Sequence, residues 1–141
     1  MNRALLELSE IIMQGLFSSR IPILLIGYLF LLVVIVMMAD TSTGTQFWAF
    51  IHALPGGDKV GHFILFGLLS LIVNLMVAGR WSHSNATGIV CLGVLLEELS
   101  QIYLPSRQFD LWDMAADAAG IFFFAWLAVA WSARRRSSLE C

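Results

Sequence analysis

Ionisable side chains interrupt three apolar stretches of this sequence, and within each stretch the polar groups recur at helical spacing. The groups are Lys59 and His62, then Glu98 and Gln101, and then Asp110, Asp113 and Asp117. Residues three or four apart lie on one face of a helix, so each stretch would present its polar groups on a single side. Ionisable groups inside apolar segments are costly, and they commonly mark a functional site.

The residue types suit proton transfer beside an anionic substrate. The candidate catalytic residues are His62, Glu98, Asp113 and Asp117, and the candidate substrate-binding residues are Lys59, Gln101, Arg107 and Asp110. Lys59 and Arg107 would hold a phosphate or another anion. His62 and Glu98 would exchange protons with the substrate. The two deeper aspartates would orient these groups or bind a metal ion.

Acids outnumber bases in these stretches. The acids are Asp58, Glu97, Glu98, Asp110, Asp113 and Asp117, and the bases are Lys59, Arg107 and, when protonated, His62. So many carboxylates cannot all ionise cheaply in a confined space. Either some are protonated, so that Glu98 would serve as a general acid, or a cation balances them. Mg²⁺, Mn²⁺, Ca²⁺ or, with His62, Zn²⁺ would suit the site. No motif selects a metal, so the cofactor stays open.

Structural roles are alternatives for several of these residues. Arg107 could form a salt bridge with Asp110 or Asp113 that fixes the turn between the stretch of Glu98 and the stretch of the aspartates. Lys59 could extend towards lipid headgroups, and His62 could be a hydrogen-bond group between helices. We expect a structural or lipid-facing role for Glu97, because adjacent helical residues point about 100° apart.

The composition indicates an integral membrane protein. Of 141 residues, 59% are hydrophobic and 13% are charged, and the mean hydropathy is +0.82. A soluble domain carries about 25% charged residues, and a short water-soluble chain could not bury so much apolar surface. We therefore expect one membrane domain over residues 1–141.

Four stretches are apolar enough to cross a bilayer, which takes roughly 20 residues. They are residues 22–39, 60–79, 86–104 and 111–132. Before them, the segment from Asn2 to Phe17 has the polar and apolar spacing of an amphipathic helix at the membrane surface. The predicted fold is an all-α membrane protein, a four-transmembrane-helix bundle with an N-terminal interfacial amphipathic helix. Within it, Ser70 and Asn74 would make interhelical hydrogen bonds, and Gly120 would allow close helix approach.

The distribution of Lys and Arg in short loops orients the chain. Arg3, Arg20, Arg80, Arg134, Arg135 and Arg136 lie on the side of the termini, and Lys59 and Arg107 lie on the other. This asymmetry predicts that both termini are cytoplasmic. The polar residues of all three stretches would then meet at the extracytoplasmic face.

The segments DKVGHFILFGLLSLIV, EELSQIYLPSRQFD and DMAADAAG together resemble the VanZ-like family of small bacterial membrane proteins. The family pattern corresponds to Lys59, His62, Glu98, Gln101, Arg107, Asp110, Asp113 and Gly120, over roughly residues 20–132. Asp117 departs from the pattern, which has asparagine there. The resemblance implies a multi-pass protein of the bacterial inner membrane that is linked to teicoplanin resistance, a form of glycopeptide resistance. It does not supply a reaction.

Two functions stay open from the sequence. The first is an enzyme that acts on an anionic, lipid-linked substrate of the cell envelope. The second is a non-catalytic binder of a lipid headgroup, a cell-wall precursor or an amphiphilic antibiotic. Membrane lipids are the expected partners of both. The basic run at residues 134–136 suits anionic lipid rather than nucleic acid, and the sequence does not indicate an oligomeric state.

Overall fold

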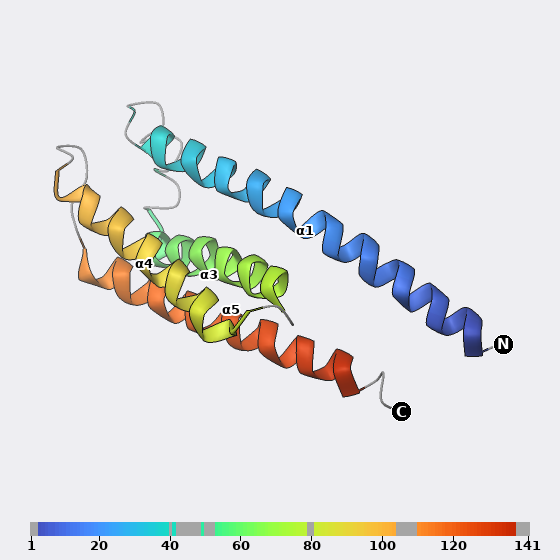
Figure 1. Ribbon diagram of the computed structural model, residues 1–141. Coiled ribbons are helices and arrows are strands. Elements are labelled where there is room, and N and C mark those ends of the chain that lie inside the picture. Colours follow the sequence, from blue (N-terminus) through green and yellow to red (C-terminus); the bar gives the residue numbers. More distant parts are fainter. Residues whose placement is uncertain are drawn as a thin grey trace.

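The computed structural model describes residues 3–39, 41, 49, 53–78, 81–103 and 110–137, and it describes no side chains for residues 3–19, 39 and 136. Within this part of the chain the protein is helical and has no strand, which confirms the predicted all-α class. The described helices are α1 (Arg3–Ala39), α3 (Gly57–Val77), α4 (His83–Gln101) and α5 (Leu111–Ser137) (Figure 1).

Three of these helices are long and apolar enough to cross a membrane. The segments are Arg20–Met38 of α1, Gly57–Val77, which is all of α3, and Leu111–Arg135 of α5. They match the predicted spans at 22–39, 60–79 and 111–132 to within three residues at each end. The remaining predicted span, 86–104, corresponds to α4, which is 19 residues long, has polar residues at both ends and is not among the three.

α1 is one continuous helix of 37 residues. The sequence predicts a surface helix from Asn2 to Phe17 and a separate span from Pro22, but the described helix does not end between them, and Pro22 lies inside it. At 1.5 Å per residue, α1 is about 55 Å long, whereas the hydrocarbon core of a bilayer is roughly 30 Å thick. The N-terminal part of α1 therefore extends beyond the part that can cross a membrane.

α3 lies in the middle of the bundle and contacts α1, α4 and α5 (Figure 1). It runs in the same direction as α5. His62 bonds Asp117 near the start of both helices, and further along Ser70 Oγ donates a hydrogen bond to the carbonyl oxygen of Ile121 at 2.9 Å. The starts of α3 and α5 consequently lie at one end of the molecule.

α4 runs in the opposite direction and brings the chain back between α3 and α5. Glu98, near its end, lies beside His62. Thr87, near its beginning, accepts a hydrogen bond from Asn74 Nδ2 at 3.2 Å, and Asn74 Oδ1 contacts His83 Nδ1 at 3.1 Å. Asn74 is fully buried, so this second polar cluster joins α3 to α4 inside the bundle. Together with the bond from Ser70 to α5, it confirms the interhelical role predicted for Ser70 and Asn74.

Two glycines set the close approach of α3 and α5. A Cβ atom at Gly120 would collide with the backbone carbonyl of Phe63, and a Cβ atom at Gly67 would collide with the ring of Phe124. The predicted role of Gly120 is thereby confirmed. Because small residues let helix backbones come together, these glycines hold the polar ends of α3 and α5 at a short separation.

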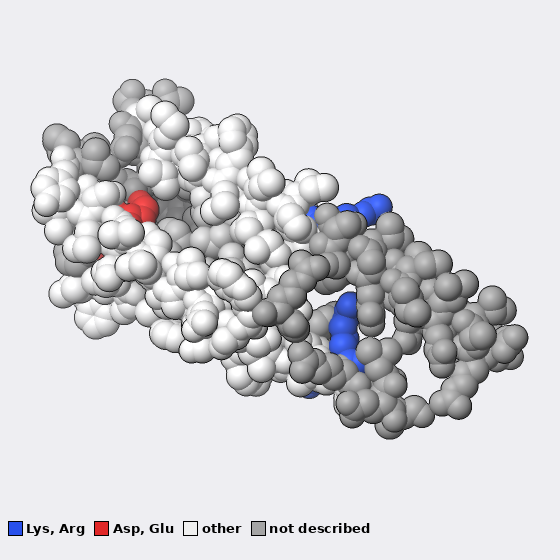
Figure 2. Space-filling view, in the orientation of Figure 1, with Lys and Arg blue, Asp and Glu red and all other residues white. Residues whose placement is uncertain are grey.

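The outer surface is largely apolar between two charged ends. In Figure 2, acidic side chains lie in a hollow near the end of α4, basic side chains lie towards the opposite end, and the surface between them is uncharged. Large apolar side chains are widely exposed on this bundle, and Phe30 and Trp112 each have more than two thirds of their area accessible. Exposure on this scale suits contact with lipid rather than with water.

Candidate functional site

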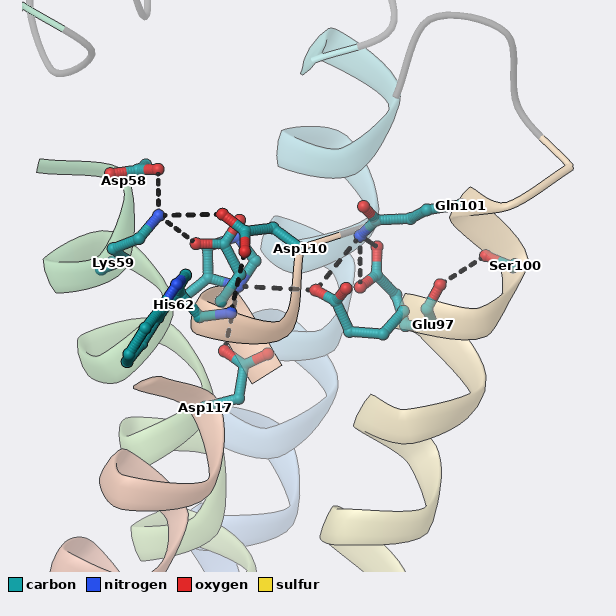
Figure 3. A network of polar contacts seen from close by, with 11 residues as sticks. Asp58, Lys59, His62, Glu97, Ser100, Gln101, Asp110 and Asp117 are labelled. Atoms are coloured by element: carbon teal, nitrogen blue, oxygen red, sulfur yellow. Dashed lines mark hydrogen bonds and ion pairs between the residues drawn. The ribbon is translucent and has the colours of Figure 1, made fainter. Parts of the chain in front are cut away.

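The polar residues of the three stretches meet where α3 and α5 begin and α4 ends (Figure 3). The parallel direction of α3 and α5 and the return of α4 bring these ends together. We call His62, Glu98 and Asp117 the buried centre. Lys59 with Asp58, Asp110 and Asp113 forms the outer ion-pair cluster, one turn nearer the helix ends.

The buried centre joins one residue from each helix. His62 Nδ1 lies 2.9 Å from Asp117 Oδ1 and 3.9 Å from Glu98 Oε1. The side chains of Glu98 and Asp117 are each 1% exposed, while that of His62 is 26% exposed. The imidazole is therefore the accessible member of the centre, and the two acids lie beneath it.

One oxygen of each buried acid makes no hydrogen bond to the described residues. Glu98 Oε2 and Asp117 Oδ2 are inaccessible and have no hydrogen-bond partner among the described residues. A buried polar atom without a partner carries a desolvation penalty of roughly 1–3 kcal/mol, and more when it is charged. This unmet requirement is the strongest sign that the centre is built for something besides packing.

Lys59 is already engaged by acids. Its Nζ lies 2.8 Å from Asp58, 3.0 Å from Asp113 and 3.2 Å from Asp110. Three carboxylates around one ammonium leave a net negative cluster. Lys59 thus neutralises acids at the mouth of the centre, and an anionic substrate would have to compete with all three acids for its ammonium group.

Asp110 also begins α5. Its Oδ1 accepts a hydrogen bond from the backbone N–H of Trp112 at 2.8 Å, which is the bond of a helix N-cap. This hydrogen bond, followed by the one from Lys59, lowers the pKa of Asp110 below its usual value of 3.8. Asp110, which the sequence assigns to substrate binding, thus has a structural role in the described contacts.

Gln101 connects the buried centre to its neighbouring acid. Its Nε2 donates to both carboxylate oxygens of Glu97, at 3.2 and 3.1 Å, and to Glu98 Oε1 at 3.4 Å. Gln101 is itself buried. It holds the Glu98 carboxylate beside His62, so its described contacts are those of a positioning residue.

An apolar cavity of about 700 Å³ lies between α1, α3 and α4. Its walls run from Leu25 to Met37 along α1, and Phe66 and Glu97 line it as well. Among the described residues that line it, Glu97 is the one ionisable residue. The Phe66 ring lies 5.8 Å from the His62 ring, centroid to centroid. The cavity therefore adjoins the buried centre without including its three residues, because Phe66 lies beside His62 and Glu97 is next to Glu98 in the sequence.

Seven of the eight predicted site residues lie together at this end. They are Lys59, His62, Glu98, Gln101, Asp110, Asp113 and Asp117. Arg107 lies outside the described residues. The sequence did not single out Thr87 and His83 of the second polar cluster, although they are four residues apart and share a face of α4. Nor did it indicate the apolar cavity, because its walls come from three helices.

Comparison with known proteins gives one informative match. An uncharacterized protein of Schizosaccharomyces pombe is 32% identical to this chain over 90 residues. The match covers 62% of this chain and 56% of that protein, so the chain spans little more than half of its relative. No protein-family model matches the chain, and no solved structure matches it.

Proposed function

We propose that this chain is a multi-pass membrane enzyme of the VanZ-like type, which acts on the headgroup of an amphiphilic, lipid-linked substrate at the extracytoplasmic face. One observation carries the proposal: the apolar cavity adjoins the buried centre at Phe66, whose ring lies beside His62, and at Glu97, which is next to Glu98. An apolar tail in the cavity would bring a headgroup to His62, the accessible member of the centre. Buried acids beside an accessible histidine are a common arrangement in sites that move protons.

The dimensions of the cavity suit an acyl or prenyl chain. Twelve helical rises separate Leu25 from Met37, which is about 18 Å at 1.5 Å each. One leaflet contributes roughly half of a 30 Å hydrocarbon core, about 15 Å. A lipid tail from one leaflet would therefore occupy most of the cavity, while the apolar lining would reject a polar ligand.

The helix directions support four spans within this proposal. α3 and α5 each have the length and composition of a span, and they begin at the same end of the molecule. If both cross the membrane, the chain must return across it between them, and α4 is the helix that does so. The polar ends of α4 would then face the two interfaces, and the first turns of α1 would lie at the cytoplasmic surface.

The choice of substrate within this class follows from the cavity. Its apolar lining would hold the tail of a phospholipid or a polyprenyl phosphate and would not hold a cell-wall peptide. Teicoplanin resistance, which the family resemblance implies, would then follow indirectly from an altered surface lipid. The membrane would be the bacterial inner membrane, with both termini in the cytoplasm.

The second candidate is a non-catalytic binder of the same amphiphile, a cell-wall precursor or a lipid-tailed antibiotic. The size of the apolar cavity favours it, because a tail can be held there without any chemistry at the buried centre. The two buried acids favour the enzyme, because each has an oxygen with no partner among the described residues and a simple binder gains nothing from that cost.

Lipid analysis of the full chain tests both candidates. The wild type, His62→Asn, Glu98→Gln and Gly93→Phe would be purified in detergent, and retained lipids would be identified by mass spectrometry. Gly93 lines the cavity and has no atom within 4 Å of an added Cβ, so a phenyl ring there would fill space. Gly27→Phe is the matched control, because Gly27 is equally open and is not among the residues that line the cavity.

We expect Gly93→Phe to lose the retained lipid and Gly27→Phe to keep it. Each protein would then be incubated with a total envelope lipid extract. Conversion of a lipid by the wild type, lost in His62→Asn and Glu98→Gln, supports the enzyme. Retention without conversion supports the binder. If the wild type neither retains nor converts a lipid, both candidates are wrong.

A further inference from the structure

The buried centre has the donor atoms of a metal site. One ligand atom from each of His62, Glu98 and Asp117 lies within 4.8 Å of the other two. Two ligands on one zinc ion, each about 2.0–2.2 Å from it, lie roughly 3–4 Å apart. The separations from His62 Nδ1, 2.9 Å to Asp117 and 3.9 Å to Glu98, are close to that range. A small movement of the two carboxylates would bring all three ligand atoms to this spacing.

A second observation points to a cation independently of this spacing. A hydrogen bond between His62 and Asp117 accounts for one oxygen of Asp117, but the other oxygen is buried and has no described partner. The same is true of Glu98 Oε2. Both side chains are 99% buried. A cation among these atoms would satisfy both carboxylates, which a single imidazole proton cannot do.

The charges around the buried centre also indicate that a cation is needed there. The two buried carboxylates face one imidazole, and the nearest described ammonium, that of Lys59, already pairs with three other acids. Two carboxylates in a low-dielectric interior repel each other strongly. A divalent ion would cancel their charge in place.

We propose that His62, Glu98 and Asp117 bind one divalent first-row metal ion of the Zn²⁺ or Mn²⁺ type. Imidazole together with carboxylate favours these ions over Mg²⁺ and Ca²⁺, which prefer oxygen ligands alone. Three protein ligands leave at least one position open, as in catalytic metal sites. Gln101, which donates to Glu98 Oε1, is the outer group that orients a ligand.

This metal centre deepens the proposed function, because the open position would face a lipid headgroup. Metal binding itself does not depend on any lipid. Elemental analysis of the full chain in detergent, followed by calorimetric titration with Zn²⁺, Mn²⁺, Mg²⁺ and Ca²⁺, measures it directly. We expect about one Zn²⁺ or Mn²⁺ per chain and much weaker binding of Mg²⁺ and Ca²⁺.

The variants separate the buried centre from the acids around it. Glu98→Gln and Asp117→Asn each remove a ligand with little change of shape. We expect each to lower the metal affinity at least tenfold, since changes to groups that only orient a ligand already lower it about 10–100-fold. Glu97→Gln is the matched control, because it makes the same change on the adjacent residue, outside the donor set. We expect its affinity to stay close to that of the wild type.

X-ray absorption of the metal-loaded wild type gives a test that needs no variant. A shell of one imidazole with oxygen ligands supports the assignment, and a shell containing sulfur overturns it. The proposal also fails if the wild type takes up no stoichiometric metal or if Glu97→Gln weakens binding as much as Glu98→Gln. Lipid retention by metal-free protein would show that only the metal centre has failed and not the proposed function.

Discussion

At the scale of single residues, the polar set divides into two layers with different roles. In the outer ion-pair cluster Lys59 pairs with three acids, one of which also caps α5, whereas the buried centre has oxygens with no described partner. Residue spacing alone does not separate these layers, because Asp110, Asp113 and Asp117 form one stripe on α5. Depth within the bundle distinguishes them.

Two substitutions separate what Asp110 contributes to stability as a helix cap from what its charge contributes. Asp110→Asn keeps an oxygen for the Trp112 N–H but loses the charge that pairs with Lys59. Asp110→Ala loses both. Because asparagine caps helices about as well as aspartate, we expect Asp110→Ala to lower the Tm in detergent by a few degrees and Asp110→Asn to lower it less. Equal losses in the two variants would mean that the cap contributes nothing.

The same residue gives a prediction for pH. The pKa of Asp110 is lower in the folded protein than its usual value of 3.8. Its contribution to stability is therefore complete above about pH 4 and is lost as the pH falls through the lower, folded-state pKa. We expect the Tm difference between the wild type and Asp110→Asn to be constant near neutral pH and to shrink below pH 4. A difference that grows on acidification contradicts this assignment.

At the scale of helices, the packing of α3 against α5 decides whether the site exists. Gly67 and Gly120 let the two backbones approach, and the approach brings His62 to Asp117. The sequence predicts the role of Gly120, because Gly120 continues the stripe of aspartates by one further turn. It does not predict that of Gly67, whose partner lies on another helix.

Glycine substitutions along this contact should have graded effects. At Gly120 the added Cβ meets the backbone of Phe63, which cannot move aside, so we expect Gly120→Ala to destabilise by roughly 1–3 kcal/mol. At Gly67 it meets the edge of the Phe124 ring, which can shift, and the carbonyl oxygen of Gly120 only at 3.2 Å, so the loss should be smaller. Gly61 has no atom within 4 Å, and Gly61→Ala should be neutral or stabilising by up to about 1 kcal/mol.

Thermal unfolding of the three alanine variants in one detergent measures this order. A Tm for Gly120→Ala at or above that of Gly61→Ala would show that α3 and α5 do not approach as closely as described. The close approach of His62 to Asp117 in the buried centre would then need another explanation.

At the scale of the whole molecule, the sequence predicts the helical class and four spans, three of which the described helices match, because apolar length is a local property. It predicts the meeting of polar residues because Lys59, Glu98 and Asp113 fall near ends of apolar runs that alternate in direction. It could not predict the continuous α1 or the cavity lined by Leu25 and Glu97, because both depend on how separate segments join or pack. The sequence could likewise not predict that Lys59 pairs with three acids, because this depends on how the helices pack.

The number of spans is a property of the whole chain, and accessibility of single cysteines tests it. In a background with Cys91→Ser and Cys141→Ser, cysteines would replace Leu54, Ser82, Tyr103 and Ser137, all of which are exposed at helix ends. With four spans and cytoplasmic termini, a membrane-impermeant maleimide added to intact cells should label positions 54 and 103 but not 82 and 137. In inside-out vesicles the pattern should reverse.

Because α3 and α5 begin at the same end, a chain in which α4 does not cross cannot keep this fold. Labelling of positions 82 and 103 from one side would therefore contradict both the four-span topology and the packing that builds the buried centre.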